Sequence, residues 1–349
     1  MFWFDKVLDW FQDKFQKDAQ HRVSSFIKDG KGGLKANEHY FQLWLDEMFL
    51  KDERKWFSEW HPTVHSAVSL EFGDQKQVIT RIAGASMLEN VDDKHLNRVI
   101  AQTMKLTGLI PFRGGSVRIN AALLAMKGQD SVKQLIDVLG EFSQKLAVPQ
   151  LSAALDVAKP LAAGVSAIVG ITDGEMMLGV DTTLDEESLE GGSFALVYAT
   201  KGEVPPGDLS ISDKRLRFRG ADLTGYHYML IRVVRFDARN DWDSLNAIMQ
   251  PYQQAVDLLT DGQSDAGKKA LKKAVGAALK SMDLTETDRR RVIDALKKRY
   301  ADAEELVGSG AFSEDVDNSL GKLMETAISP AEAAALGPIS QAEAEEGLE

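Results

Sequence analysis

The chain contains no cysteine among its 349 residues. This absence excludes disulfide bonds, zinc sites with cysteine ligands, iron–sulfur clusters and thiol nucleophiles. Disulfides persist mainly in oxidising compartments, so a cysteine-free chain favours a reducing one. We therefore expect a cytoplasmic protein.

Several motifs and long apolar runs are also missing. The chain has no Gly-x-Gly-x-x-Gly, no P-loop and no Gly-x-Ser-x-Gly, one of which a nucleotide-binding fold or an α/β-hydrolase normally carries. The longest strongly apolar run without charge, residues 160–172, is shorter than the roughly 20 residues that cross a bilayer. The N-terminus lacks the cationic and plain apolar parts of a signal peptide. We therefore expect no transmembrane segment, no cofactor and no recognisable catalytic motif.

Acidic residues outnumber basic ones. The 53 Asp and Glu against 41 Lys and Arg give a net charge of −12. An acidic surface repels phosphates and anionic lipid, which argues against broad nucleic-acid binding. A local basic patch could still bind an anion.

Residues 1–33 are predicted to form an amphipathic helix that ends in a glycine-rich segment. Apolar side chains recur there at three- and four-residue steps, with acids and lysines on the other faces. Residues 1–60 hold 14 of the 27 aromatic residues. Such a helix could dock on a partner or a second copy, lie at a membrane interface, or pack on the chain's own sheets. The predicted partner-binding residues are Trp3, Phe4, Val7, Leu8, Phe11 and Phe15.

Residues 36–240 are predicted to form an antiparallel β-sandwich, which makes the fold class α+β. From residue 66 apolar and polar residues alternate, and a turn at 73–76 separates two such runs, as in a hairpin. Residues 36–60 fit a helix or a strand, and we favour a strand. The segment 228–234 is apolar on both sides and is expected to be central. Further strands are predicted over 117–126, 176–184, 193–200, 214–219 and 226–236.

Helical patterns interrupt and follow the strands. A helical hairpin is predicted at about 130–170, inserted in the sandwich. Residues 241–336 are predicted to be helical, with helix starts at Thr285 and at Ser329–Pro330, and with Arg289, Arg290 and Arg291 on a solvated face. Residues 337–349 carry four glutamates and no basic residue. We expect this acidic tail to be disordered, or ordered only by a partner.

Two groups of charged residues are candidate sites. Period-two alternation would place Arg215, Arg217 and Arg219 on one face of a strand, as a site for a phosphorylated ligand, a lipid headgroup or an acidic partner. The alternative is a solvated strand face that discourages edge pairing.

The second group is Asp237, Asp241 and Asp243, which follow the expected central strand. These carboxylates could hold a cation or perform acid–base chemistry, or they could simply form a strand-to-helix turn with a helix cap.

The leading functional prediction is a non-enzymatic interaction or assembly subunit. It would use the aromatic N-terminal helix, the C-terminal helices or the acidic tail to bind a protein partner or its own copies. One alternative is a peripheral membrane or anion-binding module built on Arg215, Arg217 and Arg219. The other is a hydrolase or metal enzyme built on Asp237, Asp241 and Asp243.

Overall fold

A computed structural model describes residues 22–49, 60–72, 75–84, 104–127, 175–184, 190–200, 202–309 and 328–348. The chain divides into two compact units. One unit holds the β-sheets, and the other holds the C-terminal helices together with two short segments, Lys35–Tyr40 and Pro111–Arg113. The architecture is therefore α+β, with antiparallel sheets followed by a helical region. The helical insertion predicted at about 130–170 lies outside the described residues.

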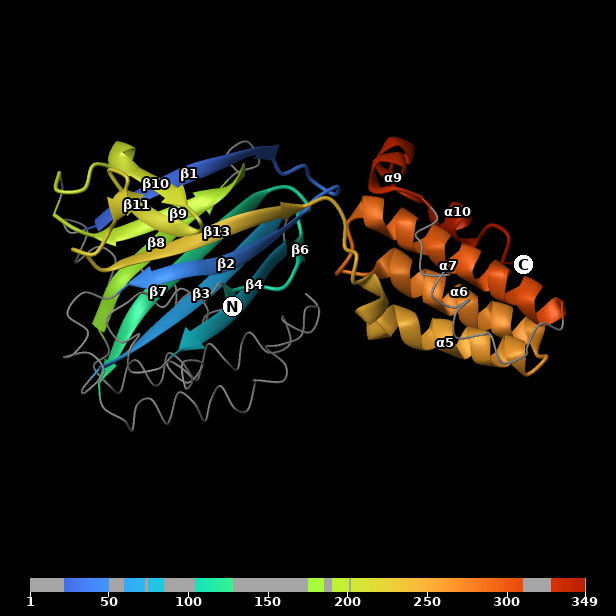
Figure 1. The fold of residues 1–349 in the computed structure, drawn as a ribbon. Coiled ribbons are helices and arrows are strands. Elements are labelled where there is room, and N and C mark those ends of the chain that lie inside the picture. Colours follow the sequence, from blue (N-terminus) through green and yellow to red (C-terminus); the bar gives the residue numbers. More distant parts are fainter. Residues whose placement is uncertain are drawn as a thin grey trace. The chain divides into compact units, whose positions relative to one another are not determined.

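The largest sheet has six strands in the order β1–β9–β13–β2–β5, with β6 paired to β2 (Figure 1). Its strands are β1 (Arg22–Gly33), β2 (Tyr40–Phe49), β5 (Met104–Lys105), β6 (Ile110–Pro111), β9 (Glu190–Tyr198) and β13 (Tyr228–Phe236). The first four residues of β13 are buried, and this strand lies between β9 and β2. Its prediction as a central strand is confirmed, as is the strand preferred within residues 36–60.

Two smaller sheets complete the first unit. One has the order β4–β3–β7–β8 and consists of β3 (Trp60–Phe72), β4 (Gln75–Gly84), β7 (Ser116–Lys127) and β8 (Glu175–Leu184). The predicted hairpin is confirmed, because Phe72 pairs with Gln75 across the turn between β3 and β4. The other consists of β10 (Leu209–Ser212), β11 (Arg215–Phe218) and β12 (Ala221–Asp222), preceded by the 3-10 helix η4 (Pro206–Asp208). Leu209 and Leu216 share a buried cluster with Val197 and Leu230 of the six-stranded sheet.

Strand β1 corrects the prediction of a helix through residue 28. Val23, Phe26 and Ile27 favour a pleated strand, and Phe26 pairs with Phe194 of β9 with ring centroids 4.6 Å apart. Gly192 makes this pairing possible, because a Cβ there would lie 2.5 Å from the Ile27 carbonyl oxygen. Residues 1–21, including all six predicted partner-binding side chains, lie outside the described residues.

The helical unit is built on three longer helices. They are α5 (Asn246–Thr260), α6 (Ser264–Lys280) and α7 (Glu286–Gly308), preceded by the 3-10 helix η5 (Trp242–Ser244). Apolar residues at three- and four-residue steps face a shared core, as Ile248, Tyr252 and Ala255 do in α5. None of the described helices is long and apolar enough to span a membrane.

Two short helices, α9 (Pro330–Leu336) and α10 (Gln341–Glu345), pack beside α6 and α7 (Figure 1). The predicted starts at Thr285 and Ser329 are confirmed, since both side chains accept a backbone N–H of the first helical turn. The prediction of a disordered acidic tail is wrong. Ser340 begins α10 with a capping box, and Ala344 and Leu348 are 0 % and 8 % exposed in the helical core. The helix cap and the burial of these two apolar side chains order the segment, although its acidic composition favours disorder.

Candidate functional site

A concentrated polar arrangement in the described part of the helical unit surrounds Asp288, in the first turn of α7. Its side chain is fully buried. One carboxylate oxygen accepts bonds from the Tyr40 hydroxyl at 2.7 Å and from the Arg239 backbone N–H at 2.6 Å. The other oxygen accepts the Arg291 Nε–H at 2.7 Å. Three donors, two of them from distant parts of the chain, therefore converge on one buried anion, which satisfies the requirement that a buried charge be paired.

Tyr40 belongs to the helical unit and bonds to the beginning of α7. Its hydroxyl donates to Asp288 and accepts the Thr285 N–H at 3.0 Å. Burial, reinforced by the nearby Asp288 carboxylate, raises the pKa of Tyr40 well above its ordinary value. The phenol therefore stays protonated and serves as a fixed donor rather than as a base.

Arg239 and Arg291 hold the segment that follows β13. Arg291 Nη2 donates to the Arg239 carbonyl at 2.9 Å, and the fully buried Arg239 side chain forms an ion pair with Asp241 at 3.2 Å. Arg291 is only 3 % exposed, although the run Arg289–Arg291 was predicted to lie on a solvated face. Its position three residues after Asp288 places both on the buried side of α7, where they pair.

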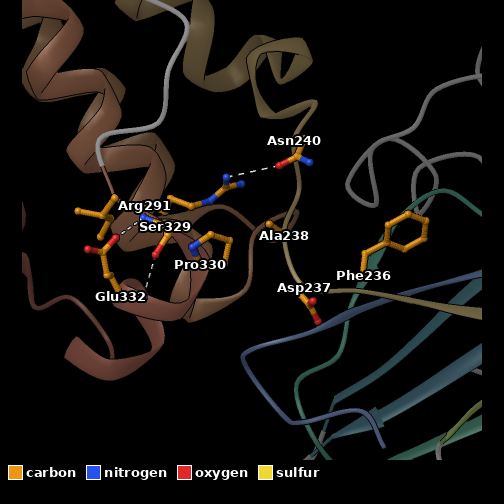
Figure 2. Close-up of a pocket in the computed structure, with 9 residues that line it drawn as sticks. Phe236, Asp237, Ala238, Asn240, Arg291, Ser329, Pro330 and Glu332 are labelled. Carbon is orange, nitrogen blue, oxygen red and sulfur yellow. Dashed lines mark hydrogen bonds between the residues drawn. The ribbon is translucent and has the colours of Figure 1, made fainter. Parts of the chain in front are cut away.

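A cavity of 710 Å³ opens beside this network, within the size range of small-molecule sites. Figure 2 shows the Arg291 side chain extended toward Asn240, with Ser329 and Pro330 nearby. Its lining residues are Phe236, Asp237, Ala238, Asn240, Arg291, Ile328, Ser329, Pro330 and Glu332.

The polar groups of the cavity are engaged within the protein. Ser329 and Glu332 form the reciprocal capping box of α9 (Figure 2). Asp237 lies 3.5 Å from His39, whose Nδ1 accepts the Lys35 N–H. Arg291 Nη1 reaches Asn240 at 3.5 Å. The arrangement anchors chain segments, and it does not pair a nucleophile with a base as covalent catalysis requires.

The three predicted aspartates do not converge. Asp237 lines the cavity near His39, Asp241 pairs with Arg239, and Asp243 acts electrostatically on Arg299. Arg299 in turn stacks over the Trp242 ring at 4.4 Å. Each carboxylate therefore has a different neighbour, which favours the turn interpretation over a shared acid–base or cation site. Within the described residues no group of three or more His, Asp or Glu side chains is arranged to hold a metal ion.

The three predicted arginines occupy β11 and the residue beyond it. Leu216 is buried between Arg215 and Arg217, as the alternation predicts. Arg219 follows the strand with φ of +50°, so the period-two pattern does not extend to it. Arg217 forms an ion pair with Asp222, and Arg219 with Asp208 at 2.9 Å. Two of the three cations are therefore already neutralised by neighbouring carboxylates, which weakens the case for an anion site.

A buried acid beneath this strand gives the arginines a structural role. Glu47 of β2 is 1 % exposed and accepts the Leu216 N–H at 2.8 Å. Burial raises the pKa of Glu47, while Leu216, Tyr228 and the charges of Arg215 and Arg217 act in the opposite direction. The arginines therefore help to compensate a carboxylate inside the sheet unit.

Glu47 predicts a pH dependence of stability. Because its pKa is higher in the folded protein, the folded state binds this proton more tightly than the unfolded chain. The wild type should therefore lose stability as pH rises from 4.5, the ordinary value, through the raised folded pKa. Urea unfolding from pH 4.5 to neutrality should show that Glu47→Gln escapes this loss.

The exposed Glu203 supplies the control, because Glu203→Gln should keep the wild-type pH dependence. If the free energy of unfolding changed with pH in the same way for wild type and Glu47→Gln, Glu47 would not be the source of the pH dependence.

Sequence reasoning missed Tyr40, Arg239 and the roles of Asp288 and Arg291. The available signal was the spacing of Asp288 with Val292 and Leu296, which places the aspartate on the apolar stripe of α7. Comparisons with known protein families, with curated proteins and with solved structures found no match.

Proposed function

We propose that the protein is a non-enzymatic assembly subunit of the cytoplasm that binds its own copies through the outer face of α5. The aromatic segment containing Trp3 and Phe11 is a second candidate surface for the same role. The observation that carries the proposal is the absence of charge over the first three turns of α5, before Asp257. Residues 244–256 contain no charged side chain, whereas 27 % of the whole sequence is charged.

The outward side of the first three turns of α5 is polar but neutral, and the exposed Asp257 follows it in the last turn. The exposed residues of these three turns are Asn246, Ala247, Gln250, Gln253 and Gln254. Met249 and Pro251 are partly exposed beside them. Interface cores are depleted in charged residues, because burying a charge costs more than burying an amide or a methyl group. This face can therefore be covered at lower cost than the charged faces of α6 and α7.

A second copy is the occupant that the chemistry favours. Asparagine and glutamine carry both donors and acceptors, so the same face can meet itself across a two-fold axis. Pro251 lacks an N–H, which leaves the Ala247 carbonyl without its usual intrahelical donor and adds an acceptor to the face. The net charge of −12 makes copies repel each other generally. A neutral contact such as this one adds no further repulsion to self-association.

Charge substitution on α5 tests the proposal. The double variant Gln250→Glu, Gln254→Glu places like charges on a self-facing surface, so we expect the dissociation constant to rise by at least about tenfold. Size-exclusion chromatography with light scattering measures the change. The matched control is Lys298→Glu, which makes the same change in net charge at an exposed position of α7.

A wild-type chain that remains monomeric at every concentration would contradict self-association. So would a double variant that associates as strongly as the control.

We also propose that the sheets form the two layers of a β-sandwich. Val117 and Ile119, two residues apart on β7, are each 1 % exposed, so one face of the four-stranded sheet is covered there. Sheets that pack face to face bury alternate residues in this way. Apolar residues also alternate in the sequence of β3. Both observations support the layered arrangement.

A further inference from the structure

Residues 337–348 lie along α6 and α7 through contacts to both backbone and side chains. We call this stretch the C-terminal strap. At its beginning, Arg290 of α7 donates from Nε to the Gly337 carbonyl at 2.8 Å and from Nη2 to the Pro338 carbonyl at 3.1 Å. These bonds bind the backbone of the segment that precedes α10. They therefore do not depend on the side chains of that segment.

Lys297 lies further along α7 than Arg290 and binds the end of α10. Its Nζ donates to the carbonyls of Glu343 and Glu346, at 3.0 and 2.8 Å. These oxygens belong to the last turn of a short helix, where the backbone has no intrahelical donors and the dipole is negative. Partial burial lowers the pKa of Lys297, while Glu346 acts in the opposite direction. The lysine thus acts as a cap supplied from another helix.

Side-chain charges on the two surfaces are complementary. Lys272 of α6 pairs with Glu345 at 2.9 Å, and Arg290 pairs with Glu343 at 3.4 Å. The bond from Lys272 lowers the pKa of Glu345, and bonds from Ser340 and Arg290 lower that of Glu343. Three cations on α6 and α7 therefore face an acidic turn, in a protein that is acidic overall.

The apolar part of the contact is small. Ala344 and Leu348, four residues apart, enter the helical core at 0 % and 8 % exposure, and the partly buried Ile339 packs against the same core. The ion pairs are partly exposed to solvent, so each adds little affinity. The strap is therefore held by modest contacts and by its covalent connection to α7, which raises its effective concentration.

We propose that Lys272, Arg290 and Lys297 form a docking site for an acidic helical peptide of a partner protein, with the strap as its built-in competitor. The strap defines the partner's chemistry. The peptide begins a helix with a serine or threonine and a glutamate three residues later. It carries two or three acids in the following turn, and an alanine and a leucine four residues apart.

Peptide binding to the full-length chain tests this site. The probe is a fluorescent peptide with the sequence of residues 338–348, followed by anisotropy. In wild type the tethered strap blocks the site. In Ala344→Asp, an acid replaces a buried methyl group and releases the strap, so the peptide should bind at least about tenfold more tightly than to wild type. Adding Lys297→Glu to the released variant should abolish that gain, and raising salt should weaken binding.

A milder variant covers the case in which Ala344→Asp does not fold. Glu345→Lys breaks the pair with Lys272 without placing a charge in the core, and should release the strap in part. Equal peptide binding by wild type and released variants would overturn the proposal, as would binding that survives Lys297→Glu or no binding at all. Wild-type dimers that Lys297→Glu dissociates would identify a second copy as the occupant and overturn the partner assignment. Substitutions on α5 should leave peptide binding unchanged, which separates this site from the proposed self-association.

Discussion

Replacing Asp288 with alanine is expected to lower the free energy of unfolding of the helical unit by about 3–5 kcal/mol. The loss arises because Arg291 would remain buried after its carboxylate partner is removed. The Tyr40 hydroxyl and the Arg239 N–H would also lose their acceptor. Each unsatisfied buried donor adds a desolvation cost of about 1–3 kcal/mol, with some overlap between these contributions.

Urea denaturation followed by far-ultraviolet circular dichroism measures the effect. Asp288→Asn should give an intermediate loss, because the amide oxygen still accepts hydrogen bonds but no longer balances the Arg291 charge. The control is Asp257→Ala on α5, where an exposed carboxylate accepts a bond from Gln253 of the same helix. That change should cost no more than about 0.5 kcal/mol. Equal losses at positions 288 and 257 would show that the buried network contributes little.

The second large effect is expected at Gly267, where α6 passes close to α5 and α7. A Cβ at this position would lie 2.5 Å from the Tyr300 hydroxyl oxygen and 3.0 Å from the Ala255 carbonyl oxygen. The carbonyl belongs to the backbone of α5 and has little freedom to move. We expect Gly267→Ala to destabilise the helical unit by about 1–3 kcal/mol, as overpacking does. Thermal or urea unfolding gives the value.

Gly276 in the same helix is the matched control, because a Cβ there would meet nothing within 4 Å. Gly276→Ala should stabilise by up to about 1 kcal/mol through helix propensity. Tyr300→Phe tests the mechanism, since its buried hydroxyl has no hydrogen-bond partner and should be removed at little cost. Combined with Gly267→Ala it should recover part of the loss, with a coupling of about 0.5–3 kcal/mol. Strictly additive effects would contradict a clash at the hydroxyl.

Local patterns predicted the elements whose residues repeat with a clear period. The alternation in residues 66–82 predicted the hairpin of β3 and β4, and the apolar segment 228–234 predicted a central strand. Thr285 and Ser329 predicted helix starts, because caps depend on neighbouring residues only. These features are encoded within a few positions of the chain.

Features that depend on distant residues escaped prediction. Residues 22–28 continue a helical pattern locally, but pairing with β9 makes them a strand. The acidic composition of 337–349 favours disorder locally, but Ala344 and Leu348 have a core to enter. Arg291 was predicted to be solvated because Tyr40 and Arg239, which bond its buried partner Asp288, lie far away in the sequence. The candidate site consists mainly of such long-range contacts, which one sequence does not reveal.

The joining of Tyr40 to α7 has a consequence for the order of folding. The two partners in the Tyr40–Asp288 bond are separated by 248 positions. During synthesis Tyr40 leaves the ribosome long before Asp288 exists, so its hydroxyl has no access to this acceptor until the beginning of α7 has been made. A fragment beginning at Phe236 would contain every C-terminal helix but would lack this phenol. Cutting the chain between the last strand and the first helix would therefore not give two fragments that each contain all of their own buried contacts.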